Sequence, residues 1–106
     1  MTWKRVGMLA DLPDGRGLRV DAPGHRVALF RVDGSVYAIG DRCSHAEASL
    51  AEGPVFDTAV ECPRHGSEFD LETGQPSCLP ASKPVPTYDT KVDDGVVYLD
   101  LPEDTP

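Results

Sequence analysis

Short runs of apolar residues, separated by Asp, Gly and Pro, make up most of the chain. The clearest runs are residues 26–32 and 36–39, which flank Asp33-Gly34-Ser35, and Asp-Gly between two such runs is a strong signal for a β-hairpin. The other expected strands are 3–9, 18–20, 58–61 and 67–71, with a final hairpin of 88–92 and 96–101 around Asp93-Asp94-Gly95. No segment keeps a 3.6-residue period, and only residues 46–51 suit a single helical turn. The pattern predicts an all-β fold.

Residues 75–86 stand apart because four prolines fall within them. Proline fixes the backbone and cannot donate to a sheet ladder, so we expect a stiff connector between hairpins. The same stiffness suits a rigid flap over a bound group, with Leu79 and Pro80 excluding water. Residues 102–106 are polar and flanked by proline, and we expect them to fray.

The length of 106 residues fits a single domain spanning 1–106, with room for one modest core. The net charge of −8 argues against a nucleic-acid partner and steers the chain toward a basic protein. There is no apolar run long enough for a membrane span and no signal-peptide pattern, so we expect a cytoplasmic monomer without membrane attachment. Three cysteines are too few for a disulfide scaffold, and paired cysteines in a reducing compartment indicate a metal more often than a disulfide.

Two short pairs carry the candidate chemistry: Cys43-Ser44-His45 and Cys62-Pro63-Arg64-His65, with sixteen residues between His45 and Cys62. Two thiolates and two imidazoles in matched pairs suit one [2Fe-2S] cluster that has two Cys on one iron and two His on the other. The tight spacing directs the Cys and His of each pair to different irons. The predicted ligands are Cys43 and Cys62 on the inner iron, and His45 and His65 on the outer iron. No catalytic residue is expected.

Zinc is the competing interpretation, because a tetrahedral site of two Cys and two His is common in proteins. Such sites usually pair two cysteines and then two histidines, with two to four or three to five residues between the members of a pair, whereas here each pair is mixed and the spacers are one and two residues. The mixed pairs therefore favour the iron–sulfur cluster, and a zinc-stapled binding module remains the alternative.

These residues resemble the signature of the Rieske-type iron–sulfur family, which is C-x-H followed by C-x-x-H. Pro63 and Gly66 also match the family's second ligand loop. The resemblance implies an antiparallel β sandwich of Rieske type with a small cluster-binding lobe, here at about residues 41–84. Without an anchor or a catalytic domain in the sequence, the chain looks like a soluble Rieske ferredoxin, the electron carrier of ring-hydroxylating dioxygenase systems.

The resemblance implies a reductase as electron donor and a terminal oxygenase as acceptor. A partner would dock over His45 and His65 and take the electron through an imidazole edge, so the chain itself breaks no bond and is not an enzyme. Other roles use the same cluster: the small subunit of a nitrite reductase, or a carrier for iron–sulfur assembly or another redox enzyme. A fragment of an oxygenase is disfavoured, because no His-rich region for a mononuclear iron follows.

Two departures separate the chain from the high-potential members of the family. Those members join the two ligand loops by a disulfide, at positions that here hold Ala48 and Arg64. They also carry a Ser and a Tyr that donate hydrogen bonds to sulfur; Ser67 matches the first, but Phe69 replaces the second. Fewer donors stabilise the sulfur charge less, so we expect a potential near the low end of the Rieske range, about −150 mV.

Five further residues have expected places. Cys78 should be a free, buried thiol, and His25 a surface residue. Arg42, Arg64 and Lys83 should flank the cluster and offset its negative charge.

Overall fold

The computed structural model describes residues 2–12, 14–22, 25–42, 48–64, 66–76 and 83–101. Within them the strands are β1 (Thr2–Met8), β2 (Gly17–Ala22), β3 (His25–Val32), β4 (Ser35–Gly40), β5 (Val55–Phe56), β6 (Ala59–Glu61), β7 (Glu68–Asp70), β8 (Thr87–Tyr88), β9 (Thr90–Asp93) and β10 (Val96–Leu101). Two short 3₁₀ helices are η1 (Leu9–Asp11) and η2 (Leu50–Glu52). The predicted all-β fold is confirmed. Among these residues no helix has the length and apolar character that crossing a membrane requires.

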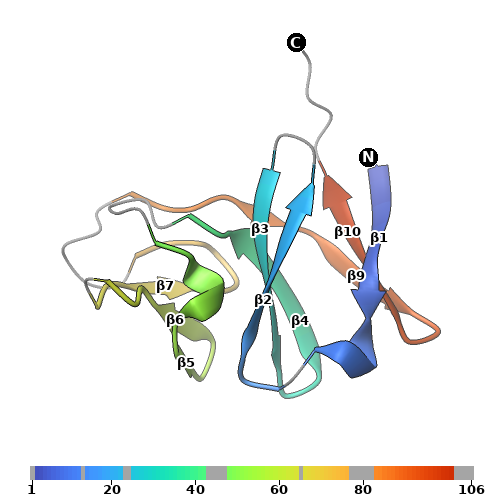
Figure 1. Cartoon of the computed structure of the whole chain (residues 1–106), viewed down its shortest axis with the longest axis horizontal. Helices are drawn as coiled ribbons and strands as arrows, with labels where there is room; N and C mark the ends of the chain where they lie inside the picture. The colour runs from blue at the N-terminus through green and yellow to red at the C-terminus, as the bar shows by residue number, and fades with distance from the viewer. Residues whose placement is uncertain are drawn as a thin grey trace, which may run out of the picture.

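The strands form three antiparallel sheets, ordered β1-β10-β9, β2-β3-β4-β8 and β5-β6-β7. The four-stranded sheet lies between the other two (Figure 1). We call the two larger sheets the base, comprising the described residues within 2–42 and 83–101. We call the described residues within 48–76 the lobe, which contains η2 and the small third sheet.

The central position of β3 explains its uninterrupted apolar run, since both faces of its sheet are covered. Val27 and Leu29 pack toward β10, whereas Ala28 and Phe30 pack toward the lobe. The base cluster contains Leu12, Val27, Leu29, Ala38, Val97 and Leu99. The lobe cluster contains Ala28, Phe30, Ile39, Leu50, Val60, Cys62, Phe69, Leu71 and Val85. One sheet thus contributes to two cores.

Two Asp-Gly turns set the register of the base, as predicted. Asp33 and Gly34 have φ of 50° and 82°, and Asp94 and Gly95 have φ of 52° and 77°. Positive φ at both central residues defines the type I′ turn, whose twist matches that of the flanking strands. Both predicted turns are confirmed, with β4 starting at Ser35 and β9 ending at Asp93.

The predicted strand 88–92 is wrong as a single element. Its first part belongs to β8, which pairs with β4, and its second part belongs to β9, which pairs with β10. The chain therefore crosses between the two base sheets at Asp89, whose carbonyl accepts a hydrogen bond from the Asp100 N–H at 2.9 Å. A strand can change sheets only where its ladder is interrupted, and the sequence does not mark that point.

Two smaller boundaries also differ from the prediction. The first strand ends at Met8, because Leu9 begins η1. The helical turn expected in 46–51 begins only at Leu50, because Ser49 is extended and pairs with Arg42.

Candidate metal centre

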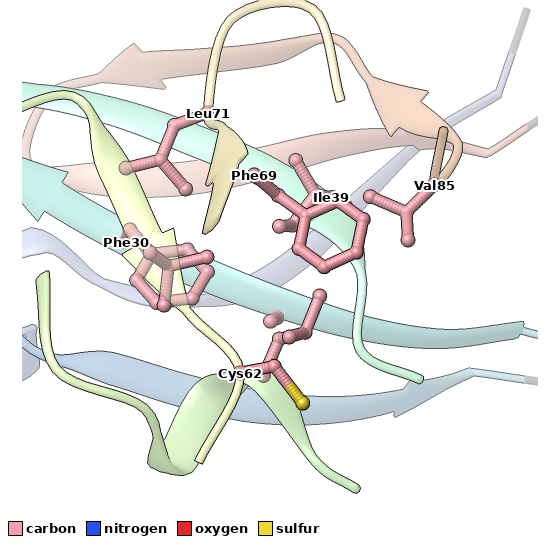
Figure 2. Packing of buried hydrophobic residues seen from close by; sticks show 9 residues of the cluster. Phe30, Ile39, Cys62, Phe69, Leu71 and Val85 are labelled. Atoms are coloured by element: carbon pink, nitrogen blue, oxygen red, sulfur yellow. The ribbon is translucent and has the colours of Figure 1, made fainter. Parts of the chain in front are cut away.

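Cys62 is the predicted ligand that falls within the described residues, whereas Cys43, His45 and His65 lie outside them. It follows β6 directly, is only 1 % exposed and is not in a disulfide. Figure 2 shows Cys62 at the edge of the lobe cluster, with its sulfur pointing away from the rings of Phe30 and Phe69. A buried free thiol that points out of the apolar cluster can act, as a thiolate, as a ligand of an iron–sulfur cluster or another soft metal.

Backbone hydrogen bonds hold the turn after Cys62, which carries the second Cys–His pair. We call these hydrogen-bonded residues the second loop base. The Cys62 N–H donates to the carbonyl of Ser67 at 2.6 Å, and the Gly66 N–H donates to the carbonyl of Cys62 at 3.0 Å. Gly66 has a φ of +76°, which favours glycine, and Ser67 is fully buried. The β6–β7 hairpin therefore fixes the backbone on both sides of position 65.

A second set of contacts, the first loop base, closes the ends of residues 43–48. Arg42 and Ser49 form an isolated antiparallel bridge. Asp41 accepts a hydrogen bond at its backbone carbonyl from the Leu50 N–H at 2.6 Å. Its carboxylate Oδ1 accepts two more, from Ser49 Oγ at 2.7 Å and from the Ala51 N–H at 3.0 Å. The sequence did not indicate this role of Asp41, because the residues that donate to it, 49–51, are not its neighbours along the chain.

The two loop bases belong to one packed unit. The segment after η2 runs against the start of the Cys62 loop, where the Glu61 N–H donates to the Pro54 carbonyl at 2.9 Å. Gly53 lies so close that an added Cβ would be 1.9 Å from the carbonyl oxygen of Glu61. Leu50 and Cys62 share the lobe cluster. The described bases of the two loops are therefore held against each other.

The C-terminal end of the proline-rich segment is anchored both to the base and to the lobe. The Gly40 N–H donates to the Pro86 carbonyl at 2.8 Å, and the Val85 N–H donates to the Gly74 carbonyl at 2.9 Å. The predicted flap residues Leu79 and Pro80 lie outside the described residues.

The other expected neighbours of the site are placed only in part. Arg42, Arg64 and Lys83 are all exposed, as flanking cations should be. Cys78 and the side chain of His25 lie outside what the structure describes.

Charge is distributed unequally between the two regions. The described residues of the base hold nine acidic and nine basic residues, whereas those of the lobe hold six acidic residues and one basic residue, Arg64. The six lobe carboxylates are Glu52, Asp57, Glu61, Glu68, Asp70 and Glu72. The net negative charge of the described part therefore comes from the region that holds Cys62.

Known proteins resemble the chain over almost its full length. The 3-phenylpropionate/cinnamic acid dioxygenase ferredoxin subunit of Escherichia coli (strain K12) is 50% identical over 99 residues, which is 92% of each chain. A chain in the solved complex of reduced oxygenase and oxidized ferredoxin in carbazole 1,9a-dioxygenase is 36% identical, with a TM-score of 0.86, covering 92% of this chain and 91% of that one. A solved structure described as an NADH-dependent nitrite reductase small subunit from Mycobacterium tuberculosis is 30% identical, with a TM-score of 0.83, covering 92% and 93%.

These relatives confirm the prediction of a Rieske-type ferredoxin, an electron-transfer component rather than an enzyme in itself. The family model described as the Rieske [2Fe-2S] domain matches residues 2–89. The bound group is thus an iron–sulfur cluster of Rieske type, which the buried, unpaired thiol of Cys62 fits. The chain belongs to the Rieske [2Fe-2S] domain family.

Proposed function

We propose that this chain carries single electrons from a reductase to the terminal oxygenase of a ring-hydroxylating dioxygenase system. The observation that carries the proposal is the buried free thiol of Cys62, which lies at the β6–β7 hairpin loop, next to the first loop base. The identity to a dioxygenase ferredoxin subunit, and to a chain of an oxygenase–ferredoxin complex, supports both the role and the acceptor.

The proposed ligands are Cys43 and Cys62 for the inner iron and His45 and His65 for the outer iron. When bound, the cluster supplies a one-electron couple in which neutral imidazoles replace two anionic thiolates and raise the potential. The chain's own residues hold and shield it. The second loop base orients Cys62, the lobe cluster excludes water behind it, and a partner would dock over the two histidines.

We further propose that residues 41–84 act as the cluster-binding lobe of one domain spanning 1–106, in a cytoplasmic, monomeric protein. The described residues of the first and second loop bases all fall within this range. A free buried cysteine at the site suits a reducing compartment.

The charge of the lobe supports a partner with a basic docking surface. The lobe holds six carboxylates and one arginine, while the base is neutral overall. Such an asymmetry orients the lobe toward a positive surface during diffusion, before any contact forms.

The test is spectroscopy and redox titration of protein purified without air. We expect two irons and two labile sulfides per chain, a Rieske-type electron paramagnetic resonance signal after reduction, and a potential near about −150 mV. A potential near about +300 mV would contradict the low-potential assignment. A colourless protein with stoichiometric zinc would contradict the electron carrier altogether and favour the zinc-stapled module.

A nitrite reductase small subunit is the second candidate, because a chain of that description shares the fold at 30% identity. The dioxygenase ferredoxin is favoured by its 50% identity over a similar length. Electron delivery to each type of acceptor, measured with the same reduced protein, separates the two.

A further inference from the structure

Asp41 is a fully buried carboxylate at the border between base and lobe. It stands two residues before Cys43, and its backbone N–H donates to the Arg26 carbonyl on β3 at 2.9 Å. Three consecutive residues on the far side of the loop, 49–51, all donate hydrogen bonds to it. One residue therefore ties the exit from β4 to the return of the chain into η2.

The charge on Asp41 is compensated from the base. Arg26 Nη2 lies 3.6 Å and Arg19 Nε 4.0 Å from Asp41 Oδ2, and both side chains are nearly half exposed. Oδ2 has no hydrogen-bond partner among the described residues, so these contacts are electrostatic rather than hydrogen-bonded. Burying an unpaired carboxylate lowers the stability of the fold. A neutral acceptor could close an ordinary turn at a smaller cost in folding free energy. An ionised acceptor makes the two bonds that Ser49 and Ala51 donate to the carboxylate roughly twice as strong as neutral ones.

We propose that Asp41 is a positioning residue for the metal centre. Its carboxylate fixes the separation between the two ends of residues 43–48, and thereby places Cys43 and His45 for cluster binding. The inference rests on the proposed function, because it assumes that those two residues are ligands. A loop whose ends are already fixed loses less conformational entropy when it binds the cluster, so the cluster is held more tightly.

The test compares Asp41→Ala with Asp70→Ala, a matched control. Asp70 Oδ1 also accepts two hydrogen bonds, from the Glu72 N–H at 2.7 Å and the Thr73 N–H at 3.2 Å, but it closes a turn that contains no predicted ligand. The measurement is the rate at which the oxidised holoprotein loses its cluster to an iron chelator. Losing charge-assisted hydrogen bonds should accelerate release about tenfold or more in Asp41→Ala, with little change in Asp70→Ala.

Milder variants keep the test informative if Asp41→Ala does not fold. Asp41→Asn keeps an acceptor oxygen and should release the cluster at a rate between those of the wild type and Asp41→Ala. Ser49→Ala removes one bond and should accelerate release about fivefold. The electron paramagnetic resonance signal of the loaded fraction should shift or broaden in the Asp41 variants but not in Asp70→Ala, even where both variants lower the unfolding temperature equally.

The two possible failures look different. A loaded wild type whose Asp41 and Ser49 variants match Asp70→Ala in release rate and spectrum overturns the positioning role alone. A wild type that takes up zinc and no [2Fe-2S] cluster overturns the proposed function beneath it.

Discussion

The base and the lobe share a chain but are stabilised in different ways. The base has strands of up to eight residues, two type I′ turns and an apolar cluster of its own. The lobe has strands of two or three residues, and its cluster is completed by side chains from β3 and β4. Sheets of such short strands are marginal by themselves. The lobe therefore depends on packing against the base and on what it binds.

The difference extends to polarity and charge. Of the described residues, the buried polar ones are Asp41 and Ser67, and both belong to loop bases around the proposed centre. The acidic excess also lies in the lobe. Buried polar groups and unbalanced charge cost stability, so their placement at the two loop bases and in the lobe indicates that binding as well as folding shapes this part of the molecule.

The largest expected effect comes from Cys62→Ala. Without this thiolate the inner iron loses half of its proposed protein ligands, so iron and sulfide content should fall to background. Metal binding contributes folding free energy, so the lobe should also become sensitive to protease while the base keeps its β-sheet circular dichroism. Iron analysis and limited proteolysis measure the two effects.

Cys78→Ala is the matched control, because Cys78 is predicted to be a free thiol and not a ligand. It should keep full iron content. Loss of the cluster in this variant, or its retention in Cys62→Ala, would show that the ligand set is wrong.

The base was largely predictable from the sequence, and the reason is local. Asp33-Gly34 and Asp94-Gly95 specify their turns through their own backbone preferences, and the flanking runs then fix the register. Cys62 could also be named as a candidate ligand from the sequence, because its spacing from His65 is a local pattern.

What escaped prediction depends on contacts between distant residues. β5 has two residues and exists because it pairs with β6, which no local pattern announces. The crossing at Asp89 depends on the two sheets that meet there. Asp41 reads as an ordinary loop acid until residues 49–51 are seen to donate to it.

A smaller effect is expected from Gly53→Ala, which tests how tightly the first loop base packs on the second. The added Cβ would collide with the backbone carbonyl of Glu61, and backbone cannot turn aside as a side chain can. We expect the free energy of unfolding to fall by about 1–3 kcal/mol, the usual cost of overpacking. Denaturant titration of the holoprotein measures it.

Gly7→Ala is its counterpart in the base. Gly7 lies in β1, has no heavy atom within 4 Å of an added Cβ, and does not have a positive φ. The free energy of unfolding of Gly7→Ala should differ from that of the wild type by no more than about 0.5 kcal/mol, as for ordinary surface substitutions. If both variants lower the free energy of unfolding equally, the lobe packs no more tightly around Gly53 than the base does around Gly7.

The smallest expected effect concerns the charge asymmetry and is kinetic. The double variant Glu52→Lys/Glu72→Lys reverses two exposed charges on the lobe, and Asp11→Lys/Asp93→Lys reverses two exposed charges on the base. Both raise the net charge equally. If the lobe faces the partner, the first pair lies nearer to the docked surface, so it should slow electron transfer to the oxygenase more than the second pair does, by about fivefold at low salt.

Ionic strength separates steering from damage to the site. At about 1 M salt the Debye length falls to about 3 Å, and the rates of the two double variants should converge on that of the wild type. A lobe variant that stays slow at high salt would point to a disturbed centre instead. Equal slowing by both variants at low salt would mean that total charge guides the encounter, and that the acidic lobe has no special role in orienting it.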